Sequence, residues 1–544
     1  MTDLDMGRFQ SVLQVFDESC AKYAEHRAFT CMGKTITYRD LEEKSRYFAA
    51  YLQNHTDLKP GDRIAIQLPN TLMFPIAVFG ALRAGMIVVN TNPLYSEREM
   101  EHQFNDSGAR AIVVLANMAH SVERVLPHTQ LKHIIVTELG DMHSGFKRVL
   151  INSVVKYVKK MVPSYHLPHA VSFRKALHLG KKGHWLPTEH KLDDIAILQY
   201  TGGTTGVAKG AMLTHRNLVA NMLQARAVIN QVLDEGGETV VAPLPMYHIY
   251  TFTVNCMVMM ELGNHSLLIT NPRDLPAFVK ELKKNDFTGF VGLNTLFVAM
   301  CNREDFRALD FSRLKLTISG GMSLTTAAAE RWKEVTGCAI AEGYGLTETS
   351  PVATFNPPNG IQLGSIGKPV PGTEIKVINE AGESLPIGES GELCIRGPQV
   401  MKGYWQRPEE TAQCISEDGW FRTGDVAVIQ EDGYARIVDR KKDMINVSGF
   451  NVYPNEIEDV IAAHPDVLEV AAVGVEDEKS GEAVKVFIVS RNSELSVKEV
   501  RDWCKERLTG YKVPKMVEFR DELPKTNVGK ILRRQLRDEE KQAS

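Results

Sequence analysis

The sequence predicts an α/β protein that has a large N-terminal domain and a small, mobile α+β domain at its C-terminal end. Three observations predict it. Strand and helix patterns alternate between residues 59 and 115, which is typical of parallel sheets covered by helices on both faces. Short strand patterns separated by turns follow Ser365 and indicate a β-rich subdomain. A chain of 544 residues also exceeds what one hydrophobic core normally supports, so at least two domains are expected.

The first hundred residues supply most of the alternation. Residues 28–38 predict a short hairpin, and residues 62–68 predict a buried strand after the turn at Pro60. A helix is expected to end near Ala84, with Gly85 as its C-cap before a strand at residues 86–89. Residues 97–105 then predict a helix and residues 111–115 a strand. The apolar stretch 71–89 contains Pro75 and Arg83, which favours a buried helix over a membrane span.

Residues 140–190 interrupt this alternation with an amphipathic pattern. Apolar residues recur at helical spacing at Phe146, Val149, Leu150, Val154, Val158 and Met161. Polar residues fall on the other side at Asn152, Lys156, Lys159 and Lys160. Such a helix either packs its apolar side on the protein body with its lysines in solvent, or rests on an anionic bilayer surface. The pattern alone leaves both interpretations open, the second being a peripheral membrane contact through residues 146–162.

Composition narrows the class of protein and its compartment. The net charge of −4 implies no general attraction to nucleic acid, so no nucleic-acid partner is expected. Eight cysteines are scattered without a C-x-x-C pair, which indicates reduced thiols in the cytoplasm and not disulfides or a zinc site. The first residues, Met-Thr-Asp-Leu-Asp, lack the features of a signal peptide. We therefore expect a cytoplasmic protein, peripheral on the inner face of the cell membrane if the basic helix binds lipid.

The most informative stretch is Tyr200-Thr-Gly-Gly-Thr-Thr-Gly-Val-Ala-Lys-Gly210. It follows a buried strand at residues 194–200, and a helical pattern begins at His215. Its glycines allow a tight turn, and its threonine hydroxyls and Lys209 suit phosphate oxygens. The Walker A spacing is absent, and a flexible surface turn is the alternative. We interpret the stretch as a nucleotide triphosphate loop of another lineage.

Three further stretches carry residues suited to a ligand. His248 lies in an aromatic loop after a strand, where α/β sheets place ligands, although a core histidine is equally compatible. In Glu342-Gly-Tyr-Gly-Leu-Thr-Glu-Thr349, Tyr344 offers an exposed ring to a base, and Glu348 is an oxygen ligand for Mg²⁺. Asp425 follows a glycine turn and is placed to accept from ribose hydroxyls.

Together these stretches resemble the adenylate-forming superfamily of acyl-CoA synthetases, luciferases and peptide-synthetase adenylation domains. The resemblance covers nearly the whole chain and is strongest to bacterial long-chain fatty acid–CoA ligases. It rests on the phosphate loop, Tyr344-Gly-Leu-Thr-Glu-Thr349 and Asp418-Gly-Trp-Phe-Arg-Thr-Gly-Asp425. It also rests on the stretch that begins Asp439-Arg-Lys-Lys-Asp-Met-Ile-Asn-Val-Ser-Gly and on Pro524-Lys-Thr-Asn-Val-Gly-Lys530. Ser323 departs from the family, in which many members carry proline, and this puts the course of the acyl-site loop in doubt.

The resemblance implies ATP, Mg²⁺ and coenzyme A as cofactor and co-substrates, and a role for each matching residue. The catalytic set is Lys530, Glu348, Thr201 and His248, with Glu348 and Thr201 also the metal ligands. The phosphate loop is Thr201, Gly202, Gly203, Thr204, Thr205, Gly206 and Lys209. The nucleotide site is Ser319, Gly320, Gly321, Glu342, Gly343, Tyr344, Gly345, Thr347, Asp425 and Arg440. The hinge and coenzyme A tunnel are Lys442, Ser448 and Gly449.

The resemblance also implies the division of the chain and its reaction. Residues 1–438 would form the N-terminal domain, 439–443 the hinge and 444–544 the C-terminal lid. A fatty acid would be activated by ATP to an acyl-adenylate and passed to coenzyme A, and a homodimer would suit the family. Two rival functions are adenylation with delivery to a carrier protein or arrest at the adenylate, and nucleotide binding without turnover. Acyl chain length and physiological pathway are not written in the sequence.

Overall fold

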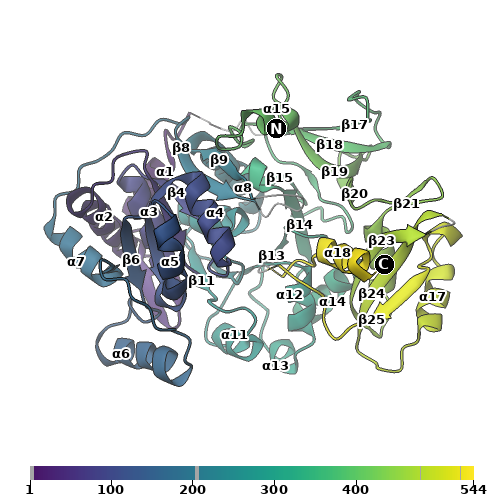
Figure 1. Ribbon diagram of the computed structural model, residues 1–544, viewed down its shortest axis with the longest axis horizontal. Helices are drawn as coiled ribbons and strands as arrows, with labels where there is room; N and C mark the ends of the chain where they lie inside the picture. Colours follow the sequence, from purple (N-terminus) through teal and green to yellow (C-terminus); the bar gives the residue numbers. More distant parts are fainter. Residues whose placement is uncertain (1–4, 6, 202–207, 478–479, 527–528, 544) are drawn as a thin grey trace. The chain divides into compact units, whose positions relative to one another are not determined.

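The computed structural model describes residue 5 and residues 7–201, 208–477, 480–526 and 529–543. These residues divide into two compact units. Unit 1 contains residues 1–291, 345–352 and 398–413, and unit 2 contains residues 292–344, 353–397 and 414–544. Figure 1 labels the helices and strands of both units. The alternation of helices and strands confirms the predicted α/β class.

The first sheet of unit 1 has seven strands in the order β7-β6-β5-β3-β4-β8-β9. Their bounds are β3 Arg63–Gln67, β4 Ile87–Asn90, β5 Ala109–Leu115, β6 His133–Thr137, β7 Val171–Ser172, β8 Ile195–Tyr200 and β9 Gly210–Thr214. All neighbours are parallel except β8 and β9. Apart from the edge strand β7, the parallel strands are mainly buried and apolar, as expected of strands covered on both faces. The strands expected at residues 62–68, 86–89 and 111–115 are therefore confirmed.

Strand β9 was not foreseen from the sequence, which left residues 211–214 unassigned between the phosphate loop and the helix predicted from His215. Residues Gly210–Thr214 instead pair antiparallel with β8, so the loop joins two strands of a hairpin. Helix α8, His215–Ile229, then begins after a capping box in which Thr214 accepts from the Asn217 amide. Five residues with glycine at one end are too short for a clear strand pattern, which explains the omission.

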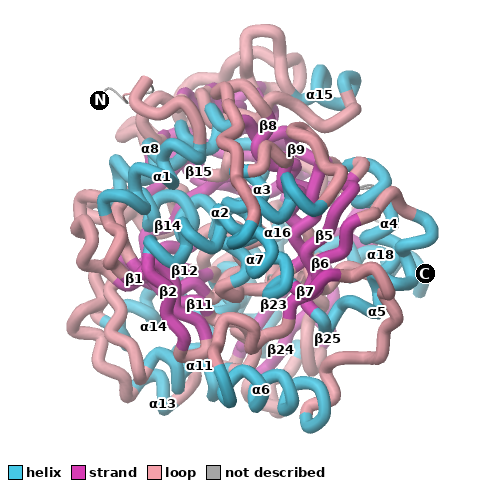
Figure 2. The backbone as a smooth tube through the Cα atoms, turned by 90° about the vertical axis from the view of Figure 1, so that its left-hand side faces the viewer, coloured by secondary structure: helices cyan, strands magenta, loops and turns pink. Residues whose placement is uncertain are grey.

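Helices of unit 1 connect this sheet to a second group of strands, β12-β10-β11-β1-β2. Those strands are β1 Arg27–Cys31, β2 Lys34–Thr37, β10 Thr239–Ala242, β11 His265–Leu268 and β12 Gly289–Gly292. Helix α2, Tyr38–His55, contacts β1, β2 and α7, and α7, Phe173–Lys182, contacts β6. Figure 2 shows α2 and α7 between the two groups of strands. The remaining helices of unit 1 are α1 Val12–Lys22, α3 Met73–Arg83, α4 Glu97–Ser107, α5 Ala119–Val125, α6 Gly145–Ser153, α9 Ile249–Thr251, α10 Met259–Glu261, α11 Leu275–Leu282 and, apart from Cys414, α15 Pro408–Cys414.

Unit 2 contains two separate antiparallel-rich sheets. Strands β17 Glu374–Ile378, β18 Ser390–Arg396, β19 Phe421–Ile429 and β20 Ala435–Arg440 form one, in that order. The other contains β21 Ile445–Val447, β22 Phe450–Val452, β23 Val467–Asp477, β24 Gly481–Ser490 and β25 Met516–Phe519. Helices α16 Pro454–Ala462, α17 Val497–Lys505 and α18 Arg533–Ala543 accompany this second sheet. The β-rich subdomain and the C-terminal α+β fold are thus confirmed.

Unit 2 also holds the strands that lead to the predicted nucleotide residues. Strands β13, Leu316–Ser319, and β14, Ile340–Gly345, are parallel neighbours. Strands β15, Val352–Phe355, and β16, Lys368–Pro369, pair antiparallel. Helices α12, Asn294–Cys301, and α13, Glu304–Arg307, precede β13 in the chain. Helix α14, Thr326–Thr336, connects β13 to β14.

The amphipathic segment forms helix α6, followed by a π-helical turn at Val154–Val158. Its orientation is opposite to the one in which the apolar side packs on the protein. Phe146, Tyr157 and Val158 are 79%, 69% and 73% exposed, whereas the polar Asn152 accepts from Gly140 N–H and donates to Glu138. Figures 1 and 2 show α6 at the edge of the fold. The interpretation of α6 as a helix packed by its apolar side is therefore wrong.

Two further expectations concern cysteines and membrane spans. All eight cysteines are free thiols, and all but Cys414 are buried. Among the described residues, no helix has the length and apolar character needed to cross a membrane. Helix α3, which covers most of the apolar stretch, is buried along its whole length, as expected.

Candidate active site

The two ends of the phosphate loop are held together in unit 1. The Thr201 N–H donates to the Lys209 carbonyl at 3.0 Å, directly beyond the last β8–β9 pair, Tyr200 and Gly210. A side chain at Gly210 would stand 3.1 Å from the Tyr200 ring, so this position favours glycine. The predicted ligands Gly202, Gly203, Thr204, Thr205 and Gly206 lie outside the described residues.

Tyr404 connects two of the predicted site residues, and sequence reasoning missed it. Its hydroxyl donates to Glu348 Oε1 at 2.6 Å, and the Lys209 ammonium lies 5.0 Å from the centre of its ring. Lys209 also forms an ion pair with Glu410. Glu348 is buried and follows strand β14, in the short 3₁₀ turn Thr347–Thr349. The structure thus brings the phosphate-loop lysine and the proposed metal carboxylate together on either side of one tyrosine.

The segment that carries Tyr404 is anchored to β9 and α4. Trp405 N–H donates to the Gly210 carbonyl at 2.8 Å, and Met212 N–H donates to the Gly403 carbonyl at 2.9 Å. The Trp405 Nε1–H donates to the Asp106 carbonyl of α4 at 3.1 Å. Because these contacts join residues about 200 to 300 positions apart, no local pattern could have revealed them.

His248 is neither a core histidine nor a group shown to contact a ligand. It is half-buried, and its Nδ1 accepts from the Tyr250 N–H at 3.3 Å, which caps α9. Its predicted role in placing the substrate carboxylate stays a prediction.

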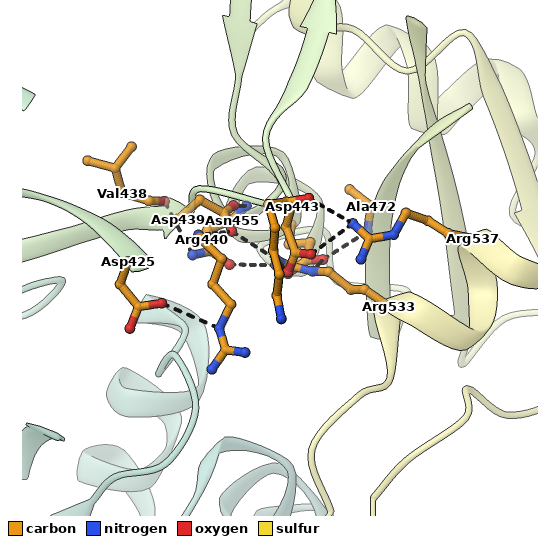
Figure 3. A network of polar contacts seen from close by, with 11 residues as sticks. Asp425, Val438, Asp439, Arg440, Asp443, Asn455, Ala472, Arg533 and Arg537 are labelled. Atoms are coloured by element: carbon orange, nitrogen blue, oxygen red, sulfur yellow. Dashed lines mark hydrogen bonds and ion pairs between the residues drawn. The ribbon is translucent and has the colours of Figure 1, made fainter. Parts of the chain in front are cut away.

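In unit 2, the predicted ribose carboxylate lies between two side-chain partners. Asp425 accepts at Oδ2 from the Tyr344 hydroxyl at 2.6 Å, and its Oδ1 lies 3.4 Å from Arg440 Nε. Asp425 and Arg440 are neighbours across β19 and β20 (Figure 3). Tyr344 is half-buried and not exposed as expected, because its hydroxyl is committed to Asp425. Burial, followed by the Asp425 charge, raises the Tyr344 pKa well above its usual value, so the hydroxyl stays protonated.

The ends of β13 and β14 offer groups suited to a nucleotide base. Among the described residues, the buried Ser319 hydroxyl has no hydrogen-bond partner. Gly321 has a φ of +85°, and a side chain there would enter open space. Glu342 is buried and accepts from the Leu324 N–H at 3.2 Å. Burial raises the Glu342 pKa to about 8, which allows this carboxyl group to donate a hydrogen bond near neutral pH.

Lys530 lies in a turn before α18. The Thr526 N–H donates to its carbonyl at 2.7 Å, and its own N–H donates to Thr526 Oγ1 at 3.1 Å. Burial of the ammonium group, followed by repulsion from Arg440, lowers the pKa of Lys530 to about 7. A perturbed lysine near other charged groups is typical of a functional site.

This lowered pKa leads to a prediction that needs no knowledge of the reaction. Since the neutral amine predominates above the pKa, trace labelling with acetic anhydride should reach half its maximum at Lys530 near pH 7. Lysines of ordinary pKa, near 10.4, should label only at much higher pH. Arg440→Gln should move the Lys530 midpoint upward, because one repulsive charge is removed. A wild-type midpoint near 10, measured by mass spectrometry of the labelled peptides, would contradict the assignment.

The predicted hinge, residues 439–443, begins with the last two residues of β20. Lys441 N–H donates to the Gly424 carbonyl at 3.0 Å, and Lys442 is exposed. Ser448 and Gly449 form the turn between β21 and β22 with φ values of +53° and +84°, and Gly449 N–H donates to Asn446 Oδ1 at 2.9 Å. These positions are described, but their roles stay predictions.

The donor chemistry fits a magnesium ion shared with substrate phosphates. Among the described residues, no group of three or more His, Cys, Asp or Glu side chains could hold a metal ion alone. Mg²⁺ commonly uses one or two carboxylates together with phosphate oxygens and water, so Glu348 as the one protein carboxylate is compatible with it.

The fold and these two groups of residues define a nucleotide-dependent α/β enzyme. The AMP-binding enzyme family matches residues 16–405, and the AMP-binding enzyme C-terminal domain matches residues 456–530. The chain belongs to the AMP-binding enzyme family, whose members activate acids through an acyl-adenylate intermediate. This confirms the resemblance on which the site residues were assigned.

Relatives of known function match over nearly the full length. The chain is 56% identical over 539 residues to a long-chain-fatty-acid–CoA ligase of Escherichia coli O6:H1, covering 99% of this chain and 96% of that protein. Proteins of the same name from Haemophilus influenzae and Bacillus subtilis are 53% and 36% identical, and each comparison covers at least 98% of this chain and 95% of the relative.

Solved structures of the family share the fold. The anthranilate CoA ligase AuaEII, in complex with anthranoyl-AMP, superposes with a TM-score of 0.87 at 26% identity, covering 98% of both chains. A benzoate CoA ligase from Burkholderia xenovorans LB400 gives a TM-score of 0.83 at 26% identity, covering 97% of this chain and 100% of that one. The chain is therefore an acid-activating enzyme with both characteristic domains.

Proposed function

We propose that this enzyme joins medium- and long-chain fatty acids to coenzyme A through an acyl-adenylate, releasing AMP and pyrophosphate. The observation that carries the substrate class is the 56% identity, over 99% of the chain, to a long-chain-fatty-acid–CoA ligase. The site geometry supports the nucleotide chemistry, because Lys209, Glu348, Asp425 and Lys530 are all present and described.

The reaction requires two anions to meet, and the chain supplies positive groups for this purpose. The fatty carboxylate attacks the α-phosphorus of ATP, and pyrophosphate leaves. We assign Lys530 to the charge that develops in this step, Asp425 to the ribose hydroxyls, and Lys209 with the loop from Thr201 to the outer phosphates. Glu348 and Thr201 would hold Mg²⁺, which shields the phosphate charge when bound. The thiol of coenzyme A then attacks the acyl carbon and AMP leaves.

We divide the chain into two domains that together serve both half-reactions. Residues 1–438 form the N-terminal domain of the proposal, and residues 444–544 form a lid that turns about the hinge at 439–443. Such motion would withdraw Lys530 after adenylation and exclude water from the reactive intermediate.

A groove in the C-terminal domain suits the nucleotide end of coenzyme A. It has a volume of about 350 Å³ and is lined by Val447, which precedes the Ser448–Gly449 turn, and by three cationic side chains, Arg501, Lys505 and Lys515. Among the described residues, the buried Arg501 Nε has no hydrogen-bond partner. Clusters of cationic side chains bind phosphates. Because the groove lies beside the Ser448–Gly449 turn through Val447, it supports the assignment of Gly449 to the coenzyme A path.

The proposal is tested by AMP release from ATP and Mg²⁺ across fatty acids of increasing length, with and without coenzyme A. AMP release that requires coenzyme A and is greatest for long acids is the expected result. Acyl-adenylate and pyrophosphate without coenzyme A-dependent turnover would indicate the carrier-loading or arrested function. Nucleotide binding without pyrophosphate release would indicate the binding protein.

We also propose that the segment from α6 to Met161 makes a peripheral contact with the anionic inner face of the cell membrane. Its exposed apolar side chains are Phe146, Val149, Leu150, Tyr157, Val158 and Met161. Exposed lysines lie among them at positions 147, 156, 159 and 160, and residues 142–188 contain no Asp or Glu. Apolar side chains that enter the acyl boundary beside lysines that meet anionic headgroups are the features of an interfacial helix.

Replacing Phe146, Tyr157 and Val158 together with serine should lower binding to phosphatidylglycerol-containing vesicles at least about 10-fold, since each exposed apolar side chain contributes on insertion. Thioester formation from a soluble short acid should not change. Ile387→Ser, an equally polar change at another exposed site, is the control and should leave vesicle binding intact. Unchanged binding of the triple variant in vesicle sedimentation would contradict the contact.

The proposal also includes a homodimer. Sedimentation velocity without lipid would test it.

A further inference from the structure

A cluster of buried charges surrounds the first residue of α18 in unit 2 (Figure 3). We call it the Arg533 cluster; it consists of Asp439, Asp443, Asn455, Glu458, Arg533 and Arg537. Asp439 and Asp443 belong to the proposed hinge, but Arg533 and its contacts have no role in the reaction as proposed above. Its central residue, Arg533, follows the turn that carries Lys530 by three positions.

Arg533 is bound on all sides of its guanidinium group. Its Nε donates to Glu458 Oε1 at 2.8 Å, and its Nη1 donates to Asp439 Oδ1 at 3.0 Å. Its Nη2 lies 2.5 Å from Asn455 Oδ1 and 2.5 Å from Glu458 Oε2. A guanidinium with two-pronged contacts of this kind has one preferred orientation, unlike a lysine ammonium.

Asp439 is a fixed acceptor for this arginine. It is buried, and its two oxygens also accept from the Arg440 and Asn455 N–H groups, each at 2.7 Å. Its neighbour Arg440 lies beside Asp425, the proposed ribose ligand. One short stretch of β20 therefore contacts both the predicted nucleotide site and Arg533.

The turn with Lys530 cannot shift freely relative to Arg533. Besides the two contacts between Thr526 and Lys530, Lys525 and Ile531 form a bridge, and Leu532 N–H donates to the Pro524 carbonyl at 2.8 Å. The described ends of the turn are thus tied together, and Arg533 sets where they lie along β20.

The partners of Arg533 fall on different sides of the proposed hinge. Asp439 is the first residue of the hinge and precedes Lys442, whereas Asn455 and Glu458 belong to α16, which follows the hinge. A rotation about Lys442 would carry Arg533, Asn455 and Glu458 together and would separate Arg533 from Asp439. Arg537 contacts Asp443 at 2.8 Å and the Lys442 carbonyl at 3.4 Å, so its partners lie at or beyond Lys442 and would move with Arg533.

We propose that Arg533 is a positioning residue, whose ion pair with Asp439 holds Lys530 in place for adenylation and separates for thioester formation. The inference rests on the proposed function, because it assigns the two arrangements to its two half-reactions. The competing interpretation is a buried ion network that only stabilises the C-terminal domain.

The test compares the two half-reactions in four variants of the Arg533 cluster and one control variant. Arg533→Met and Asp439→Asn should each lower fatty acid-dependent ATP–pyrophosphate exchange about 10-fold or more, since a misplaced catalytic group is costly. Thioester formation from supplied acyl-adenylate and coenzyme A should stay within about 3-fold of wild type. The double variant should lose no more than the larger single loss, because both changes remove one pair. Glu458→Gln should have the smaller effect on exchange, and Arg534→Met is the matched control on the same helix.

One further readout separates positioning from stability. The labelling midpoint of Lys530 should rise in Asp439→Asn, which leaves the Arg533 charge in place, as the amine leaves its buried, cationic surroundings. If Arg533→Met does not fold, Asp439→Asn decides the question, because it keeps the shape of the native side chain and one of its two acceptor oxygens. Equal loss in both half-reactions, or exchange unchanged by Asp439→Asn, would overturn the inference. Absence of exchange in the wild type would instead refute the proposed function.

Discussion

Replacing Lys530 with methionine is expected to lower acyl-adenylate formation by about 10²–10³-fold, the loss typical of a removed charge-stabilising group. The new side chain keeps most of the length of lysine and lacks its charge. The negative charge that develops when the fatty carboxylate attacks ATP is then no longer offset. Thioester formation from supplied acyl-adenylate should be nearly unaffected, because the lysine is assigned to the first half-reaction. Pyrophosphate exchange and coenzyme A consumption measure the two halves separately.

Lys525→Met is the matched control for this change. Lys525 belongs to the same turn and pairs with Glu469, away from the proposed nucleotide residues, so both half-reactions should stay near wild type. Equal losses of the two half-reactions in Lys530→Met would contradict the assignment of the lysine to adenylation alone.

Glu348→Gln should lower adenylation by about 10²-fold and raise the Mg²⁺ concentration required for ATP binding. The amide cannot supply the negative charge that a hard cation prefers. Tyr404→Phe should have a smaller effect in the same direction, since its hydroxyl orients the carboxylate from 2.6 Å. Calorimetric titration of ATP at several Mg²⁺ concentrations measures the shift without turnover.

The exposed Glu409 on α15 is the control carboxylate, and Glu409→Gln should change neither quantity. An unaltered Mg²⁺ requirement in Glu348→Gln would remove this residue from the metal site, whatever happens to the rate.

The sequence allowed the fold class and most of the strands to be predicted, whereas the site residues stay predictions. Local patterns sufficed for β3, β4 and β5, because these strands are short, apolar and bounded by turns. Family motifs supplied Asp425 and Lys530, whose side chains the structure describes with strongly charged neighbours. Their roles in the reaction await the measurements above.

What could not be predicted depends on contacts between distant parts of the chain. No sequence pattern around Tyr404 singles it out, because its importance comes from its contacts with Glu348 and Lys209. The direction of α6 was undetermined because amphipathicity reports two faces and does not say which faces the protein. The role of Arg533 was hidden because a basic tail usually lies in solvent, whereas here four acceptors surround it.

The division of the structure into units has a consequence for biosynthesis. Unit 1 is completed by residues 345–352 and 398–413, which follow its main stretch along the chain. Asn217 donates to the Pro398 and Val400 carbonyls, and strand β9 is flanked by residues 402–405. Until residue 413 has been synthesised, on the order of 10 s after residue 291 at ordinary elongation rates, these groups lack their native partners. The nascent chain therefore needs protection from premature association during that interval, and fragments that end at residue 291 should aggregate.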